Sequence, residues 1–523
     1  MNASEGQATG AAALPRVHAS VVAMLAAAAD EAPAVEALVD GERRLNYDAY
    51  LACVAAFAAR LEALGARGER VATLLANSIE ACISAFAALA AGAQQVPLNP
   101  LYTAPELEAI LADAQPRVLV VDAASAALAR PVAQRLGIAH LVEVGAHALR
   151  IDAVPAAPAA LPALPALPQP DDLALLQYTG GTTGRAKGVN LSHRGTAINV
   201  SQREALLPGR RGDRILCMMP LSHSYAMAMG LFLAPYCAGT LVILPRYQGD
   251  AVLAAVARER INVFPGSPTI FSALMAHPAF AQTDWRSVHT CYSGSAALAE
   301  ATMARWCAAV GAPVYEGYGL TEAGPVLSFN PAGRPAKPGS VGVAAPLTEI
   351  EIVDAVDGTR VLGAGERGEI RARGPQIMRG YRNRPEETAQ ALRDGWLYTG
   401  DIGEIDAEGC LYVRDRKKDM VIVGGYNVYP REVEEVLFAH PDVADAAVVG
   451  ESDAFHGERL VAHVVLRPGA QADADALVAH CRARLAKYKL PARVCFAGAL
   501  PKTSANKTDK LALRKLAPPP ASN

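Results

Sequence analysis

The stretch YTGGTTGRAKG, residues 178–188, decides the fold of this chain. An apolar, strand-like run at residues 173–178 leads into glycines and threonines, and Lys187 stands near the far end. Glycines let several backbone N–H groups point inward together, and threonine hydroxyls add donors that can rotate toward phosphate oxygens. The pattern therefore predicts a phosphate-binding loop that follows a buried strand of an α/β protein.

Three other interpretations of this loop are weaker. A flexible linker would seldom join such a run to a strand and a single lysine. A P-loop requires G-x-x-x-x-G-K-[ST], and from Gly181 the spacing is right, but Ala186 and Gly188 replace the second glycine and the hydroxyl that would bind magnesium. A kinase glycine loop lacks its H-R-D and D-F-G companions.

Four more motifs follow in a fixed order along the chain. They are YGLTE at residues 318–322, YTGD at 398–401, DRKKD at 415–419 and LPKTSANK at 500–507. Taken singly, YGLTE is equally consistent with a turn, YTGD with a solvated turn aspartate, DRKKD with an exposed charge run, and the lysine of LPKTSANK with an ordinary surface lysine. Together with the glycine-rich loop, the ordered set resembles the adenylate-forming superfamily, which includes acyl-CoA synthetases, carrier-loading adenylation domains and firefly luciferases. The likeness spans nearly the whole chain.

The resemblance implies a binding site for ATP and AMP. An aromatic ring can stack on adenine, a hydroxyl can bond the α-phosphate, and a bidentate carboxylate such as Asp401 suits two ribose hydroxyls. The positions implied to bind ATP or AMP are Thr179, Gly180, Gly181, Thr182, Thr183, Gly184, Lys187, Gly294, Ser295, Ala296, Glu316, Gly317, Tyr318, Asp401 and Arg416.

The resemblance also implies the catalytic set, which is Lys507, Thr321, Glu322 and His223, with Glu322 as the Mg²⁺ ligand. The residue before the lysine is usually glycine in the family and is Asn506 here. Asparagine tolerates left-handed backbone better than other non-glycine residues, so the loop can survive the exchange. Lys510 is the rival if the register of this loop has slipped. His223 is also consistent with a structural histidine.

The fold class expected is α/β. We expect a large N-terminal domain of layered parallel sheets with helices and a small antiparallel β unit, then a small mobile α+β domain. The boundaries are 1–414 for the large ATP- and acyl-binding domain, 415–419 for the hinge, 420–515 for the small domain with the catalytic lysine, and 516–523 for a disordered tail. By resemblance, Lys418 is the hinge residue, and Gly424 and Gly425 form a loop that faces coenzyme A. Residues 153–170 are proline-rich and are expected to form an exposed connector.

The implied reaction is ATP-dependent acid–thiol ligation, in which an acyl-adenylate forms with release of pyrophosphate and coenzyme A then accepts the acyl group. Residues 215–245 contain no Asp, Glu or Lys, which argues against an α-amino acid substrate. Met227, Met229 and residues 231–233 favour an apolar acyl tunnel, although core packing explains some of them equally well. We expect a fatty acid; loading of an acyl carrier protein and activation of an aryl acid stay open.

Composition limits the partners and the location. The net charge is −3, so we expect no nucleic acid partner. The nine cysteines are scattered singly, which favours reduced thiols and a cytoplasmic protein over a disulfide framework. Residues 21–29 are apolar but run into Asp30 and Glu31, so a buried amphipathic helix is expected there and no transmembrane segment. A monomer and a homodimer are both compatible with the sequence.

Overall fold

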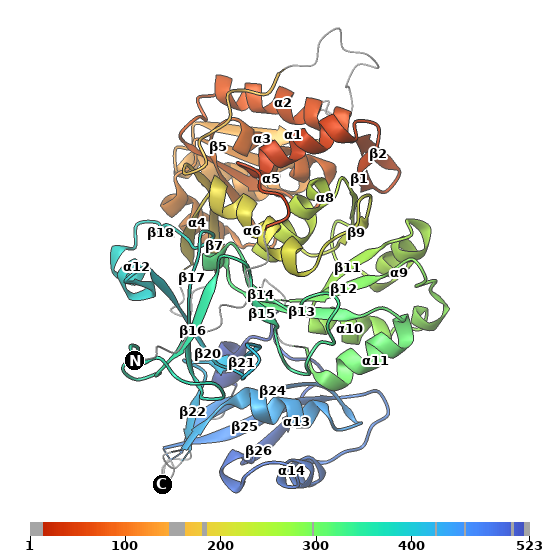
Figure 1. Cartoon of the computed structure of the whole chain (residues 1–523), viewed down its shortest axis with the longest axis vertical. Coiled ribbons are helices and arrows are strands. Elements are labelled where there is room, and N and C mark those ends of the chain that lie inside the picture. The colour runs from red at the N-terminus through yellow and green to blue at the C-terminus, as the bar shows by residue number, and fades with distance from the viewer. Residues whose placement is uncertain are drawn as a thin grey trace, which may run out of the picture.

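The structure is a computed structural model that describes residues 14–145, 163–179, 186–294, 296, 298–423, 426–453, 457–503 and 507–516. Its described residues form two large sheets, a small antiparallel sheet and a C-terminal α+β unit. The predicted α/β fold with a small second domain is confirmed. Figure 1 shows the N-terminal elements in the upper part of the molecule and the C-terminal elements, coloured blue, in the lower part.

The first large sheet is parallel in its centre, from β13 to β1, and antiparallel at both edges. Its inner strands are short and largely buried, as expected for a sheet covered on both faces, whereas the edge strand β2 is mostly exposed. In spatial order they are β15 (Val343–Ala344), β14 (Val326–Phe329), β13 (Val314–Gly319), β12 (Thr290–Ser293), β11 (Val263–Gly266), β9 (Arg214–Cys217), β10 (Thr240–Ile243), β1 (Glu36–Asp40) and β2 (Arg43–Asn46).

The second large sheet carries the stem of the glycine-rich loop. Its β4, β3, β5, β6 and β7 run parallel, whereas β8 and β18 continue the sheet in antiparallel pairing. In spatial order its strands are β18 (Gly380–Tyr381), β8 (Lys187–Ser192), β7 (Leu173–Thr179), β4 (Gln94–Leu98), β3 (Arg70–Leu74), β5 (Val118–Asp122) and β6 (His140–Val144).

Helices fill the space between the two large sheets and cover their outer faces. The largest apolar cluster combines side chains of both sheets with α1, α2 and α3, so these helices form a shared inner layer. The inner elements are α1 (Val21–Glu31), α2 (Tyr47–Ala63), α3 (Ile79–Ala90), α6 (His193–Leu206), α7 (Ser224–Ala226), η1 (Met227–Phe232) and α8 (Leu233–Tyr236). The outer elements are α4 (Ala104–Ala114), α5 (Ala123–Arg135), α9 (Gly249–Arg258), α10 (Pro268–Met275), η2 (Phe280–Gln282) and α11 (Glu300–Val310).

Two sequence expectations are refined in this part of the chain. The helix expected at residues 21–29 is α1, which buries Val21, Val22, Met24 and Leu25. Ser20 caps its N-terminus, because its hydroxyl accepts a hydrogen bond from the backbone N–H of Ala23 at 3.1 Å. The described part of the proline-rich connector, residues 163–170, forms no helix or strand. It is not simply exposed, because Leu164 and Leu167 pack against the main core.

In Figure 1 the antiparallel sheet lies on the left, at and below the level of β14 and β15, and the C-terminal unit, coloured blue, lies at the bottom. The antiparallel sheet comprises β16 (Glu349–Val353), β17 (Gly368–Arg373), β20 (Trp396–Ile405), β19 (Leu392–Arg393) and β21 (Leu411–Arg416), with η3 (Thr321–Ala323) and α12 (Pro385–Ala391) outside it. The C-terminal unit comprises β22 (Val421–Val423), β23 (Tyr426–Val428), β24 (Val443–Asp453), β25 (Gly457–Leu466), β26 (Arg493–Phe496), α13 (Pro430–Phe438), α14 (Ala474–Arg482), η4 (Lys487–Lys489) and α15 (Lys510–Lys515).

Among the described helices, none is long and apolar enough to cross a membrane. All nine cysteines fall within the described residues and are free thiols, most of them buried.

Candidate active site

The glycine-rich loop connects two neighbouring antiparallel strands. β7 ends at Thr179, β8 begins at Lys187, and these two residues lie opposite each other in the ladder. The hairpin therefore holds both ends of the loop together and fixes the position of Lys187 beside it. The predicted phosphate-binding residues Gly180, Gly181, Thr182, Thr183 and Gly184 lie outside the described residues.

Lys187 and Glu322 both contact Tyr381. The Lys187 ammonium lies 5.0 Å from the centroid of the Tyr381 ring, and the Tyr381 hydroxyl donates a 2.8 Å hydrogen bond to Glu322 Oε1. Tyr381 reaches this place because β18 pairs with β8, with Tyr381 opposite Val189. One cation and one carboxylate from distant motifs thus meet around a single aromatic ring.

Asp401 is the buried carboxylate of the site, with 3% of its surface exposed. Tyr318 donates its hydroxyl proton to Oδ2 at 2.6 Å, and Arg416 Nε pairs with Oδ1 at 2.8 Å. Burial raises the pKa of Asp401, while the charge of Arg416 opposes that rise. Three of the predicted motifs, carried by β13, β20 and β21, therefore converge on this carboxylate.

Lys507 is brought to the same place from the C-terminal unit. Its pKa is lowered, first by burial and next by the charge of Arg416, while the carboxylates Asp401 and Glu322 act in the opposite direction. The rival Lys510 points elsewhere: its ammonium pairs with Glu434 Oε1 at 2.8 Å within the C-terminal unit. The structure therefore brings Lys507, and not Lys510, together with the other predicted site residues.

His223 and Thr321 lie on the inner side of this cluster. The His223 Nδ1 accepts a 3.3 Å hydrogen bond from the backbone N–H of Tyr225 at the start of α7. Burial, assisted by the charge of Lys507, lowers the pKa of His223 to about 4, so the imidazole is neutral near pH 7. The hydroxyls of Ser224 and Thr321 are 3.4 Å apart, which joins α7 to η3.

Glu316 and the small residues beside it form the wall next to these groups. Glu316 is 3% exposed and accepts a 2.8 Å hydrogen bond from the backbone N–H of Leu298. A Cβ on Gly317 would come within 2.3 Å of the Phe329 ring, and a Cβ on Gly294 within 2.6 Å of the Tyr225 ring, so neither position has room for a side chain. Ala296 is exposed, and the predicted Ser295 lies outside the described residues.

The buried Glu316 makes the stability of the protein depend on pH. Burial raises the pKa of Glu316 from its ordinary 4.5 to about 7, although Arg431 opposes this and Glu435 and Glu300 add to it. Between these two pKa values the folded protein holds a proton that the unfolded chain releases. The contribution of the protonated Glu316 to the free energy of unfolding is therefore full below pH 4.5 and is lost as the pH rises through about 7. Ionisation of Glu316 is expected to lower the free energy of unfolding by about 2 to 3 kcal/mol between pH 5 and pH 8.

The Glu316→Gln variant keeps the size of the side chain but has no group there that ionises. Its free energy of unfolding is therefore expected not to show this decline between pH 5 and pH 8. The measurement is chemical unfolding of both proteins at pH 5 and pH 8. An identical decline in the two proteins would show that Glu316 is ionised in the folded state at both pH values.

The predicted hinge region begins at the end of β21. Asp415 and Arg416 close that strand, and the backbone N–H groups of Asp419 and Met420 both donate to the Arg416 carbonyl oxygen, at 2.9 and 3.2 Å, forming a turn that contains the exposed Lys418. The predicted residues Gly424 and Gly425 lie outside the described residues.

Two residues of the site carry no motif of their own. Tyr381 stands between arginines in RGYRNRP, and its importance comes from the β18–β8 pairing, which joins residues far apart in sequence. Ser224 follows the predicted His223, and a hydroxyl beside that histidine is the only local signal that could have drawn attention to it. Contacts between residues far apart in the sequence bring both side chains to the site, and no short sequence pattern encodes such contacts.

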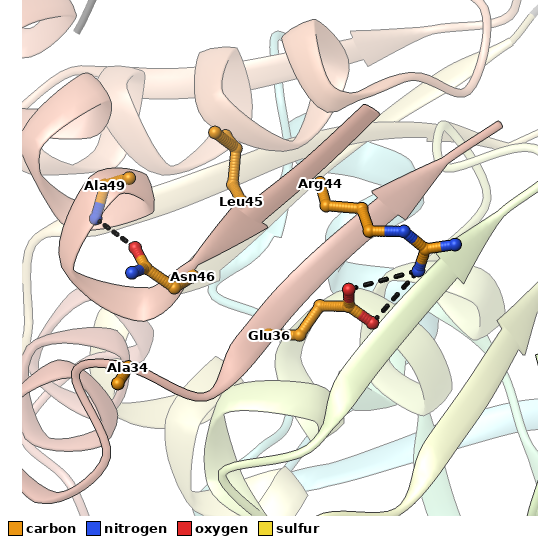
Figure 2. A pocket seen from close by; sticks show the side chains of 6 residues that line it. All are labelled: Ala34, Glu36, Arg44, Leu45, Asn46 and Ala49. Carbon is orange, nitrogen blue, oxygen red and sulfur yellow. Dashed lines mark hydrogen bonds and ion pairs between the residues drawn. The ribbon is translucent and has the colours of Figure 1, made fainter. Parts of the chain in front are cut away.

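A surface depression elsewhere offers no comparable chemistry. It has a volume of about 360 Å³ and lies between β1, β2 and the start of α2 (Figure 2). Its polar groups already have partners: Arg44 pairs with Glu36 at 3.1 Å and with Glu259 at 3.1 Å, and Asn46 caps α2 through the backbone N–H of Ala49 at 2.9 Å. β2 is an edge strand of its sheet, at the end opposite to β13. This depression is therefore a salt-bridged surface feature.

The metal-binding capacity of the site rests on a single carboxylate. Within the described residues, no group of three His, Cys, Asp or Glu side chains is placed to hold a metal ion. Glu322 nevertheless fits Mg²⁺, because that ion is commonly bound through one or two carboxylates, water and the phosphates of its nucleotide. Glu322 already accepts a hydrogen bond from the hydroxyl of Tyr381 through Oε1, and Lys187 lies over the same ring.

Comparison with known proteins places the chain in a family. The AMP-binding enzyme family matches residues 25–382, and the AMP-binding enzyme C-terminal domain matches residues 432–507. The chain is similar to a long-chain-fatty-acid–CoA ligase of Bacillus subtilis, with 35% identity over 94% of each chain. It is also similar to a feruloyl-CoA synthase of an Amycolatopsis species, with 37% identity over 92% of this chain and 96% of the relative.

A solved structure agrees over the same span. The ATP-bound crystal structure of MatB from Rhodopseudomonas palustris superposes with a TM-score of 0.86 and 32% identity, covering 95% of this chain and 98% of MatB. The family match, the full-length relatives and the convergence of Lys187, Glu322, Asp401 and Lys507 lead to one conclusion. The chain belongs to the AMP-binding enzyme family, the adenylate-forming superfamily, and is an AMP-forming acid–CoA ligase.

Proposed function

We propose that this ligase activates a fatty acid or a similarly apolar monocarboxylic acid with ATP and transfers the acyl group to coenzyme A. The observation that carries the proposal is the meeting of Lys507 from the C-terminal unit with Glu322, Asp401 and Arg416 from the large domain. The similarity to the long-chain-fatty-acid–CoA ligase supports the class of acid. An aryl acid is the second candidate, supported by the equally extensive similarity to the feruloyl-CoA synthase.

The first half-reaction joins two anions. The substrate carboxylate attacks the α-phosphorus of ATP, a mixed anhydride forms, and pyrophosphate leaves. Two unit charges of the same sign about 4 Å apart repel each other by about 4 kcal/mol at an effective dielectric constant near 20. Cationic groups that stand where negative charge builds up in the transition state offset this repulsion. We assign this task to Lys187 and Lys507.

The remaining site residues position the nucleotide and the acid. We propose that Asp401 accepts hydrogen bonds from the ribose hydroxyls with the lone pairs that Tyr318 and Arg416 leave available. Thr321 then donates to the α-phosphate. The neutral His223 donates from Nε2 toward the substrate carboxylate, since its Nδ1 is already an acceptor. Bound Mg²⁺, held by Glu322, supplies further neutralisation of the phosphates.

The second half-reaction requires the lysine to leave and a thiol to enter. We propose the division of the chain into residues 1–414, a hinge at 415–419 with Lys418, and a mobile domain at 420–515 that rotates between the two steps. In the arrangement described here, Glu432 of α13 pairs with both Arg367 of the large domain and Lys489 of its own unit. The Arg367 side of this contact is open to solvent, and ion pairs that solvent reaches contribute little to stability, which suits a contact that must break in every turnover.

The acid and the acceptor are tested together. Pyrophosphate release is measured across a panel of straight-chain and aryl acids, with and without coenzyme A, and the products are identified by mass. We expect acyl-CoA and AMP, with a higher kcat/KM for fatty acids than for unsubstituted aryl acids. Acyl-adenylate that accumulates despite excess coenzyme A would contradict that acceptor and would favour an acyl carrier protein.

The free thiols are in keeping with a reducing compartment, and we propose a cytoplasmic location on this ground.

A further inference from the structure

The last turn of α6 buries two charged side chains beside the candidate active site. Arg203 and Glu204 are 1% and 4% exposed, and they pair with each other through Arg203 Nη1. The Arg203 guanidinium also lies 4.4 Å from the centroid of the Tyr292 ring on β12. A buried arginine is rare unless its charge and its donors are matched, so this pair requires an explanation.

The carboxylate of the pair is well satisfied. Glu204 Oε2 accepts a 2.8 Å hydrogen bond from the backbone N–H of Gly209, and the Cys237 thiol approaches it at 3.9 Å. Glu204 is therefore fixed by the loop that follows α6. Burial raises the pKa of Glu204, but contact with the Arg203 guanidinium favours the ionised carboxylate, so the two charges offset each other. What still needs an explanation is how the N–H donors of Arg203 are satisfied, since its charge is already paired.

The guanidinium has more donors than this pairing uses. Arginine carries five N–H donors, and within the part of the chain that the structure describes Arg203 Nε and Nη2 meet no acceptor. Leaving such a donor buried and unpaired is costly, and native proteins seldom do so. These two nitrogen atoms therefore point to an acceptor that is not part of the described protein.

Further unpaired polar atoms lie on the same elements. The buried Tyr225 hydroxyl on α7, Ser293 Oγ at the end of β12 and Gln177 Oε1 on β7 likewise have no hydrogen-bond partner among the described residues. Two contacts place these groups near one another: Tyr225 packs on Gly294 next to Ser293, and Gln177 Nε2 is 3.3 Å from Met227 Sδ at the start of η1. η1 is a π-helix, a local distortion that is frequent at functional sites.

This polar cluster, defined as Arg203, Tyr225, Ser293 and Gln177, adjoins the catalytic groups. Tyr225 follows His223 and Ser224 directly, and the Ser224 hydroxyl is 3.4 Å from that of Thr321. The apolar side chains expected to line an acyl tunnel instead belong largely to the core, where Phe232 packs against Phe86 with ring centroids 5.7 Å apart. The surroundings of η1 are thus more polar than a site for a plain hydrocarbon chain requires.

We propose that Arg203 and Tyr225 form a specificity-determining subsite that donates hydrogen bonds to an oxygen atom at the far end of the acyl group. The inference rests on the proposed function and names the class of acid: one with a distal hydroxyl, ether or keto oxygen, on either an aliphatic or an aromatic frame. A second carboxylate is disfavoured, because Glu204 already neutralises the guanidinium and a further anion would be buried without a counter-charge.

The test compares matched pairs of acids in the coupled formation of acyl-CoA. One arm uses 10-hydroxydecanoate against decanoate, and the other uses 4-hydroxycinnamate against cinnamate, which separates the aliphatic from the aromatic source of the oxygen. In at least one arm we expect kcat/KM of the wild-type enzyme to favour the oxygenated acid by about 10- to 100-fold, since sites built to bond a hydroxyl discriminate strongly against its absence.

Variants of the polar cluster test whether its residues cause the preference for the oxygenated acid. Arg203→Met combined with Glu204→Gln removes both charges and leaves no unpaired ion, and Tyr225→Phe removes only one hydroxyl. We expect the preference to fall to within about threefold of unity in the double variant and to weaken several-fold in Tyr225→Phe. Arg44→Met, a change to the salt-bridged depression of Figure 2, is the matched control and keeps the wild-type ratio.

Two outcomes would overturn the inference. One is equal kcat/KM for both members of both pairs in the wild-type enzyme, and the other is an unchanged preference in Tyr225→Phe and the double variant; either would assign Arg203 to packing alone. Failure of every acid in the panel to yield acyl-CoA is a different result, since it would contradict the proposed function itself. If the double variant does not fold, the isosteric Tyr225→Phe still decides the question.

Discussion

Replacement of Lys507 by alanine is expected to reduce acyl-adenylate formation by about 100- to 1000-fold while leaving thioester formation from supplied acyl-adenylate largely intact. The charges of Glu322, Asp401 and Arg416 act on the ammonium of Lys507, and we propose that this ammonium lies where the carboxylate and the α-phosphate of ATP meet. Its contribution is largest in the transition state of the first step. In the second step the proposed rotation of the C-terminal domain withdraws it.

The matched control for this variant is Lys510→Ala. Lys510 is three residues away and pairs with Glu434 inside the C-terminal unit, so its removal is expected to leave adenylation close to the wild-type rate. Pyrophosphate release measures the first half-reaction, and conversion of synthetic acyl-adenylate with coenzyme A measures the second. Equal losses in both half-reactions of a folded Lys507→Ala protein would contradict the division of labour between the two steps.

The change Asp401→Asn is expected to lower kcat/KM for ATP by about 100-fold, mainly through a higher KM. The carboxylate is buried and already holds Tyr318 and Arg416 at 2.6 and 2.8 Å. An amide presents only one acceptor oxygen, so it cannot hold those two groups and both ribose hydroxyls as well. The expected effect therefore combines lost nucleotide contacts with an Arg416 that has lost its counter-charge.

Asp406→Asn gives the comparison for Asp401. Asp406 follows the same strand, β20, and its carboxylate pairs with Lys337 at 2.7 Å outside the candidate site. Steady-state kinetics with varied ATP, together with the melting temperature of each variant, separate nucleotide binding from stability. A wild-type KM for ATP in a folded Asp401→Asn protein would show that this carboxylate does not hold the ribose.

Local patterns were sufficient for many of the elements. Local sequence is enough to indicate α13, because Pro430 opens this helix and its apolar face is regular. The end of α14 is harder to predict: the helix stops at Arg482, because the backbone N–H groups of Arg484 and Leu485 turn back to the Cys481 carbonyl oxygen, at 2.9 and 2.8 Å. Strand ends and helix ends depend on tertiary contacts that periodicity does not contain.

Some residues of the candidate site were indicated by local motifs, and others are placed only by tertiary contacts. Asp401 and Lys507 stand in motifs whose order along the chain indicated a shared site, although no spacing rule shows that they would meet across a domain boundary. Tyr381 depends on a strand pairing between β18 and β8. Arg203 and Glu204 lie in a helix whose polar composition is typical of a surface helix, yet α6 is buried along most of its length. Tertiary burial overrode the local pattern there.

The central claim is that the assembled residues form an acyl-adenylate before any thiol takes part. Acid-dependent exchange of labelled pyrophosphate into ATP, measured without coenzyme A, tests this claim most directly. We predict exchange that requires both Mg²⁺ and a carboxylic acid, and that falls by at least about 100-fold in Lys507→Ala. Exchange that appears only when coenzyme A is present, or that persists unchanged in the variant, would contradict the account.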